Sequence, residues 1–107
     1  MLKNKNAVVT GSTSGIGLGV AKVLAKNGAN IMINGFGTNE QIEAAKKEIS
    51  AFGVKVEYDG ADLSKPDQAT SLITNTIAKL GCVDILVNNA GIQHVSPIES
   101  FTGAKWE

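Results

Sequence analysis

The stretch Ala7–Gly17, AVVTGSTSGIG, places three apolar residues directly before a glycine-rich loop. Its glycines, Gly11, Gly15 and Gly17, follow the spacing G-x-x-x-G-x-G, and an apolar helical pattern begins at Ile16. A strand, a glycine turn and a helix in this order let backbone N–H groups approach a diphosphate closely. The spacing matches neither G-x-G-x-x-G nor a P-loop. A glycine turn without a ligand remains the alternative.

Three more short apolar runs follow this unit, at Ile31–Ile33, Val54–Val56 and Ile85–Val87. The gaps between runs, of about 20 to 30 residues, are long enough for a crossover helix each time. The first, second and fourth runs show no alternation, which is typical of parallel strands covered on both faces. The third alternates with Lys55 and is expected to lie nearer an edge of the sheet.

The gaps carry apolar residues at helical spacing and have helix start and stop signals. Thr38 stands three residues before Gln41, as in a capping box. Ser64 is expected to cap a helix that opens with Pro66. The expected terminal glycines are Gly28, Gly53 and Gly81, and the expected buried stripe of the first helix is Ile16, Val20, Val23 and Leu24.

The βαβαβαβ pattern predicts the α/β class, with a Rossmann-type doubly wound parallel sheet that is incomplete. Residues 1–107 are expected to form the cofactor-binding portion of a single domain, because neither a linker nor a composition shift divides them. Strand four is expected to leave an unpaired edge where further strands belong.

Composition excludes several other classes of protein. The 107 residues are 43% hydrophobic, and ten acidic residues balance ten basic ones, all lysines. Zero net charge without arginine argues against nucleic-acid binding, and no window approaches the roughly 18 apolar residues of a membrane helix. The single cysteine, Cys82, excludes an intrachain disulfide and a cysteine-based zinc site. No metal and a cytoplasmic location are expected.

The residues after each strand indicate which ligand the loop would take. Asn34–Gly37, at the place where a dinucleotide fold meets the adenosine ribose, contains neither an acid nor a base, which favours NAD over NADP. Phe36 is expected either to lie against the ribose and adenine or to pack under the loop. Asp62 could accept a hydrogen bond from the adenine amino group, or simply precede a helix. Asn88–Gly91 offers two amides and small residues, which a turn would also favour.

These motifs, in this order on these elements, resemble the short-chain dehydrogenase/reductase family over essentially all 107 residues. The resemblance implies an oxidoreductase that transfers a hydride to or from a nicotinamide dinucleotide. It implies cofactor contacts at Gly11, Thr13, Gly15, Ile16, Gly17, Phe36, Asp62, Leu63, Asn89, Ala90 and Gly91.

Within the family, Asn34–Gly37, Tyr58–Leu63 and Gly91–His94 most resemble the bacterial 3-hydroxybutyrate dehydrogenases, which interconvert 3-hydroxybutyrate and acetoacetate with NAD. This branch implies that Gln93 helps to hold the substrate carboxylate, although Gln93 could be a solvated loop amide. It also implies a homotetramer for the full-length protein. Another family member, such as a 3-oxoacyl thioester reductase, and a non-catalytic nucleotide-binding module remain alternatives.

The chain departs from the family in its catalytic residues. The family uses an asparagine, a serine and a tyrosine four residues before a lysine. The only tyrosine, Tyr58, has Asp62 in that place. No catalytic residue is therefore expected within residues 1–107, which read as a truncated or partial chain without dehydrogenase turnover of its own.

Overall fold

The computed structural model describes residues 2–88 and 94–101, in which strands and helices alternate as far as β4. Every predicted strand and helix is present, although the third strand begins at Val56, two residues later than predicted. The elements in chain order are β1 (Asn6–Val9), α1 (Gly15–Lys26), β2 (Asn30–Asn34), α2 (Asn39–Ser50), β3 (Val56–Asp59), α3 (Pro66–Leu80), β4 (Val83–Asn88) and β5 (His94–Phe101).

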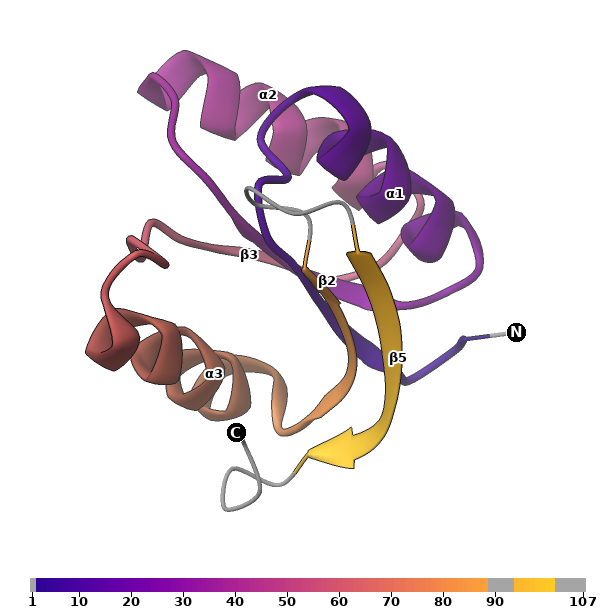
Figure 1. Ribbon diagram of the computed structural model, residues 1–107. Helices are drawn as coiled ribbons and strands as arrows, with labels where there is room; N and C mark the ends of the chain where they lie inside the picture. The colour runs from indigo at the N-terminus through magenta and orange to yellow at the C-terminus, as the bar shows by residue number, and fades with distance from the viewer. Residues whose placement is uncertain (1, 89–93, 102–107) are drawn as a thin grey trace.

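The described strands form one sheet in the order β3-β2-β1-β4-β5. The first four are parallel, and Ala7 of β1 pairs with Ile31 of β2 on one side and with Ile85 of β4 on the other. Helices α1 and α2 cover one face of the sheet, and α3 covers the opposite face (Figure 1). The doubly wound arrangement is therefore confirmed, and β3 lies at an edge as predicted.

β5 is an element that the sequence analysis did not predict. It pairs antiparallel with β4, and the register shifts between Val83 and Ile85. The expectation of an unpaired edge at strand four is therefore wrong. Pro97 lies inside β5 and removes a backbone donor, which argues against a strand when only the sequence is read.

The central strand contributes to a hydrophobic core on each face of the sheet. Ala7 and Val9 pack in the cluster that includes residues of α1 and α2, whereas Val8 packs in the cluster that includes residues of α3. All three residues are fully buried. Burial on both faces explains why β1 is apolar without alternation.

The predicted stripe of α1 is only partly correct: Val20 and Leu24 are partly buried and pack against the core cluster, but the other two residues do not. The buried residues of α1 are Gly17, Ala21 and Ala25, whereas Ile16 is 64% exposed and Val23 is 60% exposed. Gly17, Ala21 and Ala25 let the helix backbone approach the strands closely, so the larger residues Val20 and Leu24 pack beside this contact and stay partly exposed.

A polar ladder crosses the amino ends of the four parallel strands. The backbone N–H of Asn6 donates to Oδ2 of Asp84 at 2.9 Å, and Nδ2 of Asn30 donates to Oδ1 of Asn6 at 2.9 Å. Oδ1 of Asn30 in turn accepts from the backbone of Lys55 at 3.0 Å. These bonds run from β4 through β1 and β2 to the start of β3, so they support the register of the sheet.

The helix starts agree only in part with the sequence signals. Thr38 and Gln41 form the predicted capping box. Ser64 does not cap α3, because the N-cap position is Lys65. The Ser64 hydroxyl instead donates to Asp62 Oδ1 at 2.7 Å, a local contact of the kind that serine side chains make in turns. The terminal glycines have positive φ as predicted.

Candidate functional site

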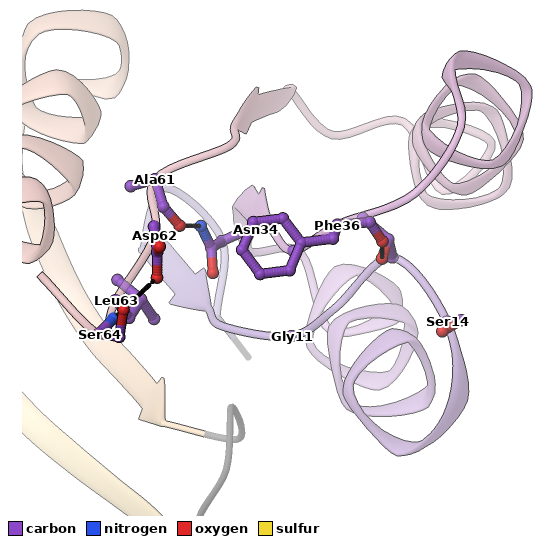
Figure 2. A pocket seen from close by; sticks show the side chains of 10 residues that line it. Gly11, Ser14, Asn34, Phe36, Ala61, Asp62, Leu63 and Ser64 are labelled. Carbon is purple, nitrogen blue, oxygen red and sulfur yellow. Dashed lines mark hydrogen bonds between the residues drawn. The ribbon is translucent and has the colours of Figure 1, made fainter.

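A cavity of about 510 Å³ lies where β1, β2 and β3 end. The carboxyl ends of parallel strands are where open α/β sheets bind ligands. Its walls come from the glycine loop after β1, the tip of β2 and the segment that follows β3 (Figure 2). The lining residues are Gly11, Thr13, Ser14, Asn34, Gly35, Phe36, Ala61, Asp62, Leu63 and Ser64.

The structure brings most of the sequence-predicted site residues to this cavity or next to it. Gly15, Ile16 and Gly17 form the first turn of α1, directly after the lining residue Ser14. The predicted positions Asn89–Gly91 and Gln93 lie outside the described residues. The predicted residues that line the cavity itself are Gly11, Thr13, Phe36, Asp62 and Leu63.

The N-terminus of α1 differs from those of the other two described helices. Ser14 makes no side-chain capping bond, and the first turn of α1 contains no acidic residue. By contrast, Thr38 caps α2, and Asp67 lies in the first turn of α3. A Cβ placed on Gly15 would meet nothing within 4 Å, so space is open at this helix start. Unpaired amides and the positive end of the helix dipole suit an anion such as a diphosphate.

Ser12 joins the glycine loop to the tip of β2. Its hydroxyl donates to the carbonyl of Val9 at 2.6 Å and accepts from the backbone N–H of Asn34 at 3.0 Å. The Ser12 N–H donates to the Asn34 carbonyl at 2.6 Å. Ser12 is fully buried. These bonds fix two walls of the cavity relative to each other.

Gly35 and Phe36, at the tip of β2, are held by hydroxyl groups from two neighbouring elements. The Thr13 hydroxyl donates to the Phe36 carbonyl at 2.9 Å, and the Tyr58 hydroxyl donates to the Gly35 carbonyl at 2.6 Å. The Phe36 side chain is 74% exposed, and its ring points into the cavity (Figure 2). The alternative that Phe36 packs under the loop is therefore wrong.

Asn34 is a site residue that the sequence analysis did not single out. Its side chain is buried, and Nδ2 donates to the carbonyl of Asp59 at 2.9 Å. Nδ2 also donates to the carbonyl of Ala61 at 3.1 Å (Figure 2). It thereby fixes the segment after β3 against β2. The available signal was an amide that closes an apolar strand immediately before a glycine.

Asp62 provides the negative charge of the cavity. Its Oδ1 accepts from the Ser64 hydroxyl at 2.7 Å and from the Ser64 backbone N–H at 3.0 Å. These two bonds, with a smaller contribution from Lys65, hold the pKa of Asp62 below its ordinary value. The carboxylate is therefore ionised at neutral pH and can act as an acceptor. Among the ten lining residues, Asp62 is the only charged one.

Cys82 lies at the other end of the sheet, next to the polar ladder. Burial, followed by the hydrogen bond to Asp84, raises the pKa of its thiol, so the neutral form predominates at pH 7. The described residues contain no group of three or more His, Cys, Asp or Glu side chains that could hold a metal ion. Within the same part of the chain, no helix is both long enough and apolar enough to cross a membrane.

Comparisons with known proteins agree with this geometry. D-beta-hydroxybutyrate dehydrogenase of Cupriavidus necator is 52% identical over 109 residues, which cover all of this chain and 41% of that protein. The 3-oxoacyl-[acyl-carrier-protein] reductase of Chlamydia muridarum is 37% identical, over 99% of this chain and 43% of the reductase. The chain therefore spans less than half the length of these relatives.

The fold is shared with solved structures. A short-chain dehydrogenase from Burkholderia cenocepacia, crystallised in complex with NADP, superimposes with a TM-score of 0.80 at 36% identity, covering 89% of this chain and 39% of that one. The family model described as short chain dehydrogenase matches residues 5–107. With almost the whole chain matched, this protein belongs to the short-chain dehydrogenase family, whose members are oxidoreductases.

Proposed function

We propose that this chain is the cofactor-binding part of an NAD-dependent dehydrogenase that interconverts 3-hydroxybutyrate and acetoacetate. The observation that carries the proposal is the cavity at the carboxyl ends of β1–β3, which combines an uncapped helix start with an ionised Asp62. The 52% identity to the Cupriavidus necator enzyme supports the choice of substrate. Dinucleotide folds bind their ligand at this edge of the sheet.

The residues of the cavity suit the chemical groups of a dinucleotide. The first-turn amides of α1 and the glycine loop would bind the diphosphate. Phe36 would lie against the ribose and adenine, and Asp62 would accept a hydrogen bond from the adenine amino group. Leu63 would provide apolar contact beside Asp62. The contacts at Asn89–Gly91 remain predictions of the family resemblance.

The charge of the cavity favours NAD over NADP. None of its ten lining residues is a lysine or an arginine, and Asp62 is negative. A 2′-phosphate would therefore lose hydration without gaining a cationic partner, which is unfavourable. The NADP bound to the Burkholderia cenocepacia relative belongs to a chain that is 36% identical, so the shared fold does not decide the preference.

In this proposal the chain's own residues bind and orient the dinucleotide, and they do not supply the acid and base for proton transfer. When bound, the dinucleotide accepts or donates the hydride at its nicotinamide ring. The family's tyrosine and lysine pair has no counterpart here, because Tyr58 is followed four places later by Asp62. The Tyr58 hydroxyl is also engaged with a backbone carbonyl at 2.6 Å. We therefore assign proton transfer to residues of the full-length protein that this chain does not contain. In the same proposal, Gln93 positions the substrate carboxylate. The full-length protein is proposed to be a homotetramer.

A second candidate function is reduction of a 3-oxoacyl thioester. The 37% identity to the Chlamydia muridarum reductase, over 99% of this chain, favours it. The two functions can be separated in the full-length protein by comparing turnover of 3-hydroxybutyrate with turnover of an acetoacetyl thioester. Faster reduction of the thioester would replace the first proposal with the second.

Calorimetric titration of the chain with NAD and NADP tests the cofactor. We expect NAD to bind at least about tenfold more tightly, the equivalent of roughly 1.4 kcal/mol. Asp62→Asn should weaken NAD binding, because the neutral amide is a poorer acceptor and also presents N–H donors. Asp67→Asn, an exposed change outside the cavity, is the control and should leave binding unchanged. Equal or tighter binding of NADP would contradict the cofactor assignment.

A further inference from the structure

Tyr58 is tied to the cavity without lining it. The half-buried tyrosine lies on the edge strand β3, and its hydroxyl donates to the Gly35 carbonyl at 2.6 Å. A Cβ placed on Gly60 would lie 2.9 Å from Tyr58 Oη, so the hydroxyl can occupy this place only because residue 60 lacks a side chain. Two features of the sequence, a tyrosine and a glycine, therefore combine to bring one hydroxyl to one carbonyl.

The hydrogen bond from Tyr58 holds Gly35, whose backbone conformation is already restricted. Gly35 has a φ of +146°, and a Cβ there would lie 3.0 Å from Thr13 Oγ1. The next carbonyl, that of Phe36, accepts from the Thr13 hydroxyl. Two consecutive carbonyls at the tip of β2 are thus held from opposite sides, one by the glycine loop and one by β3. The backbone that carries the Phe36 ring is fixed before any ligand arrives.

We propose that Tyr58 is a positioning residue that sets the preference for an unmodified ribose, by fixing Gly35 and therefore the tip of β2. The inference rests on the proposed function and deepens it. A fixed tip is preorganised for the smaller ligand, which pays no cost for ordering the loop. The held tip of β2 cannot move away to make room for a 2′-phosphate or for the water that would solvate one. Tyr58 thus adds a steric and conformational contribution to the electrostatic one.

The variant Tyr58→Phe tests this inference, since it keeps the ring and removes only the hydroxyl. Adenosine diphosphate ribose and its 2′-phosphorylated form are the probes, because they carry the adenine, ribose and diphosphate expected at this cavity and lack the nicotinamide. We expect calorimetry to show binding of the unmodified probe about three- to tenfold weaker, as for one lost hydrogen bond. Binding of the 2′-phosphorylated probe should change less than about twofold, so the ratio of the two affinities falls.

Two further variants separate positioning from general stability. Gly60→Ala should lower the same ratio, because the new methyl group displaces the Tyr58 hydroxyl without removing it. Thr76→Val is the matched control, because it removes a buried hydroxyl that bonds only within α3, to the Leu72 carbonyl. It should leave the ratio unchanged even if the melting temperature falls.

The outcomes distinguish this inference from the proposed function. If the wild-type chain binds neither probe, the proposed function fails and the inference fails with it. Suppose instead that the wild-type chain binds the unmodified probe, and that Tyr58→Phe weakens the binding of both probes equally or of neither. The inference alone is then overturned, and Tyr58 has a purely structural role. Faster amide hydrogen exchange at residues 35–37 in Tyr58→Phe would support the positioning role independently of any ligand.

Discussion

Gly35 shows how a single position controls the candidate site. Its φ of +146° lies in a region that residues with a side chain rarely adopt, and a Cβ would lie 3.0 Å from Thr13 Oγ1. The residue also carries the carbonyl that Tyr58 holds. Glycine is therefore required here both for the backbone conformation and for the close approach of the glycine loop.

Gly35→Ala should destabilise the chain by about 1–3 kcal/mol, because the backbone is strained and Thr13 must move. NAD binding should weaken as well, since the displaced tip carries Phe36. Denaturant unfolding and calorimetry measure the two effects. Gly53→Ala is the control, because Gly53 also has positive φ (+85°) but lies in open space. It should cost about 1 kcal/mol without altering NAD binding. Equal losses of binding in the two variants would contradict this account.

The site residues that the sequence revealed are those with a local signature. The glycine spacing indicated Gly11, and a carboxylate after an apolar strand indicated Asp62, whereas Thr13 came from the family resemblance. Asn34 and Tyr58 were named only within longer segments and without a role, because their partners lie on or directly after other strands, 23 to 27 residues away in the chain. Such partners depend on which strands are neighbours in the sheet, and periodicity within one segment contains no information about that.

At the scale of elements, α1 shows where a periodicity argument fails. The large apolar residues predicted a buried stripe; Val20 and Leu24 of that stripe pack against the core. Ile16 and Val23, however, are exposed. The smaller set that includes Ala21 and Ala25 faces the sheet. Hydrophobicity alone ranks the large residues higher, but close packing of a helix against strands depends on shape as well. Helix α2 has a capping box, and there the predicted start was correct.

Gly19→Ala should stabilise the chain by about 0.5–1 kcal/mol, because alanine is the better residue inside a helix. Gly19 lies in α1 on the exposed side, and a Cβ there would meet nothing within 4 Å. Urea unfolding of the variant and of the wild type provides the comparison. Gly53→Ala, which also adds a methyl group in open space but at positive φ, should shift stability in the opposite direction. A loss of stability in Gly19→Ala would show that this flank of α1 is not open.

At the scale of the whole molecule, the parallel sheet could be predicted, but its last strand could not. Four apolar runs separated by helical gaps permit few topologies, because parallel crossovers are right-handed. Only five residues separate β4 from β5, too few for a crossover helix, and β5 contains Pro97, so neither an apolar run nor a helical gap indicated this strand. The polar ladder was also not predicted, since Asn6 and Asn30 look like ordinary strand-flanking residues in the sequence.

Asn6→Ala should lower the free energy of unfolding by about 1–3 kcal/mol. The change removes the Asn6 amide from the ladder and leaves the partly buried polar groups of Asn30 and Leu80 without their partner. Thermal and denaturant unfolding measure the loss. Asn27→Ala, which removes an exposed amide bonded to the Val23 carbonyl, is the control and should cost less. Ligand affinity at the cavity should be unchanged in Asn6→Ala; a large drop would show that the two ends of the sheet are energetically coupled.

The ladder and the cavity lie at opposite ends of the same strands, and this separation has a consequence for redesign. Alignment of the strands is supported at one rim by Asn6, Asn30 and Asp84, while the candidate cavity lies at the other rim. Changes to the loops at the cavity rim therefore leave the ladder in place, but Ser12 and Asn34 must be kept, because they join the strand ends at that rim. A sheet organised in this way can accept a different ligand as long as the bonds between its strands remain at both rims.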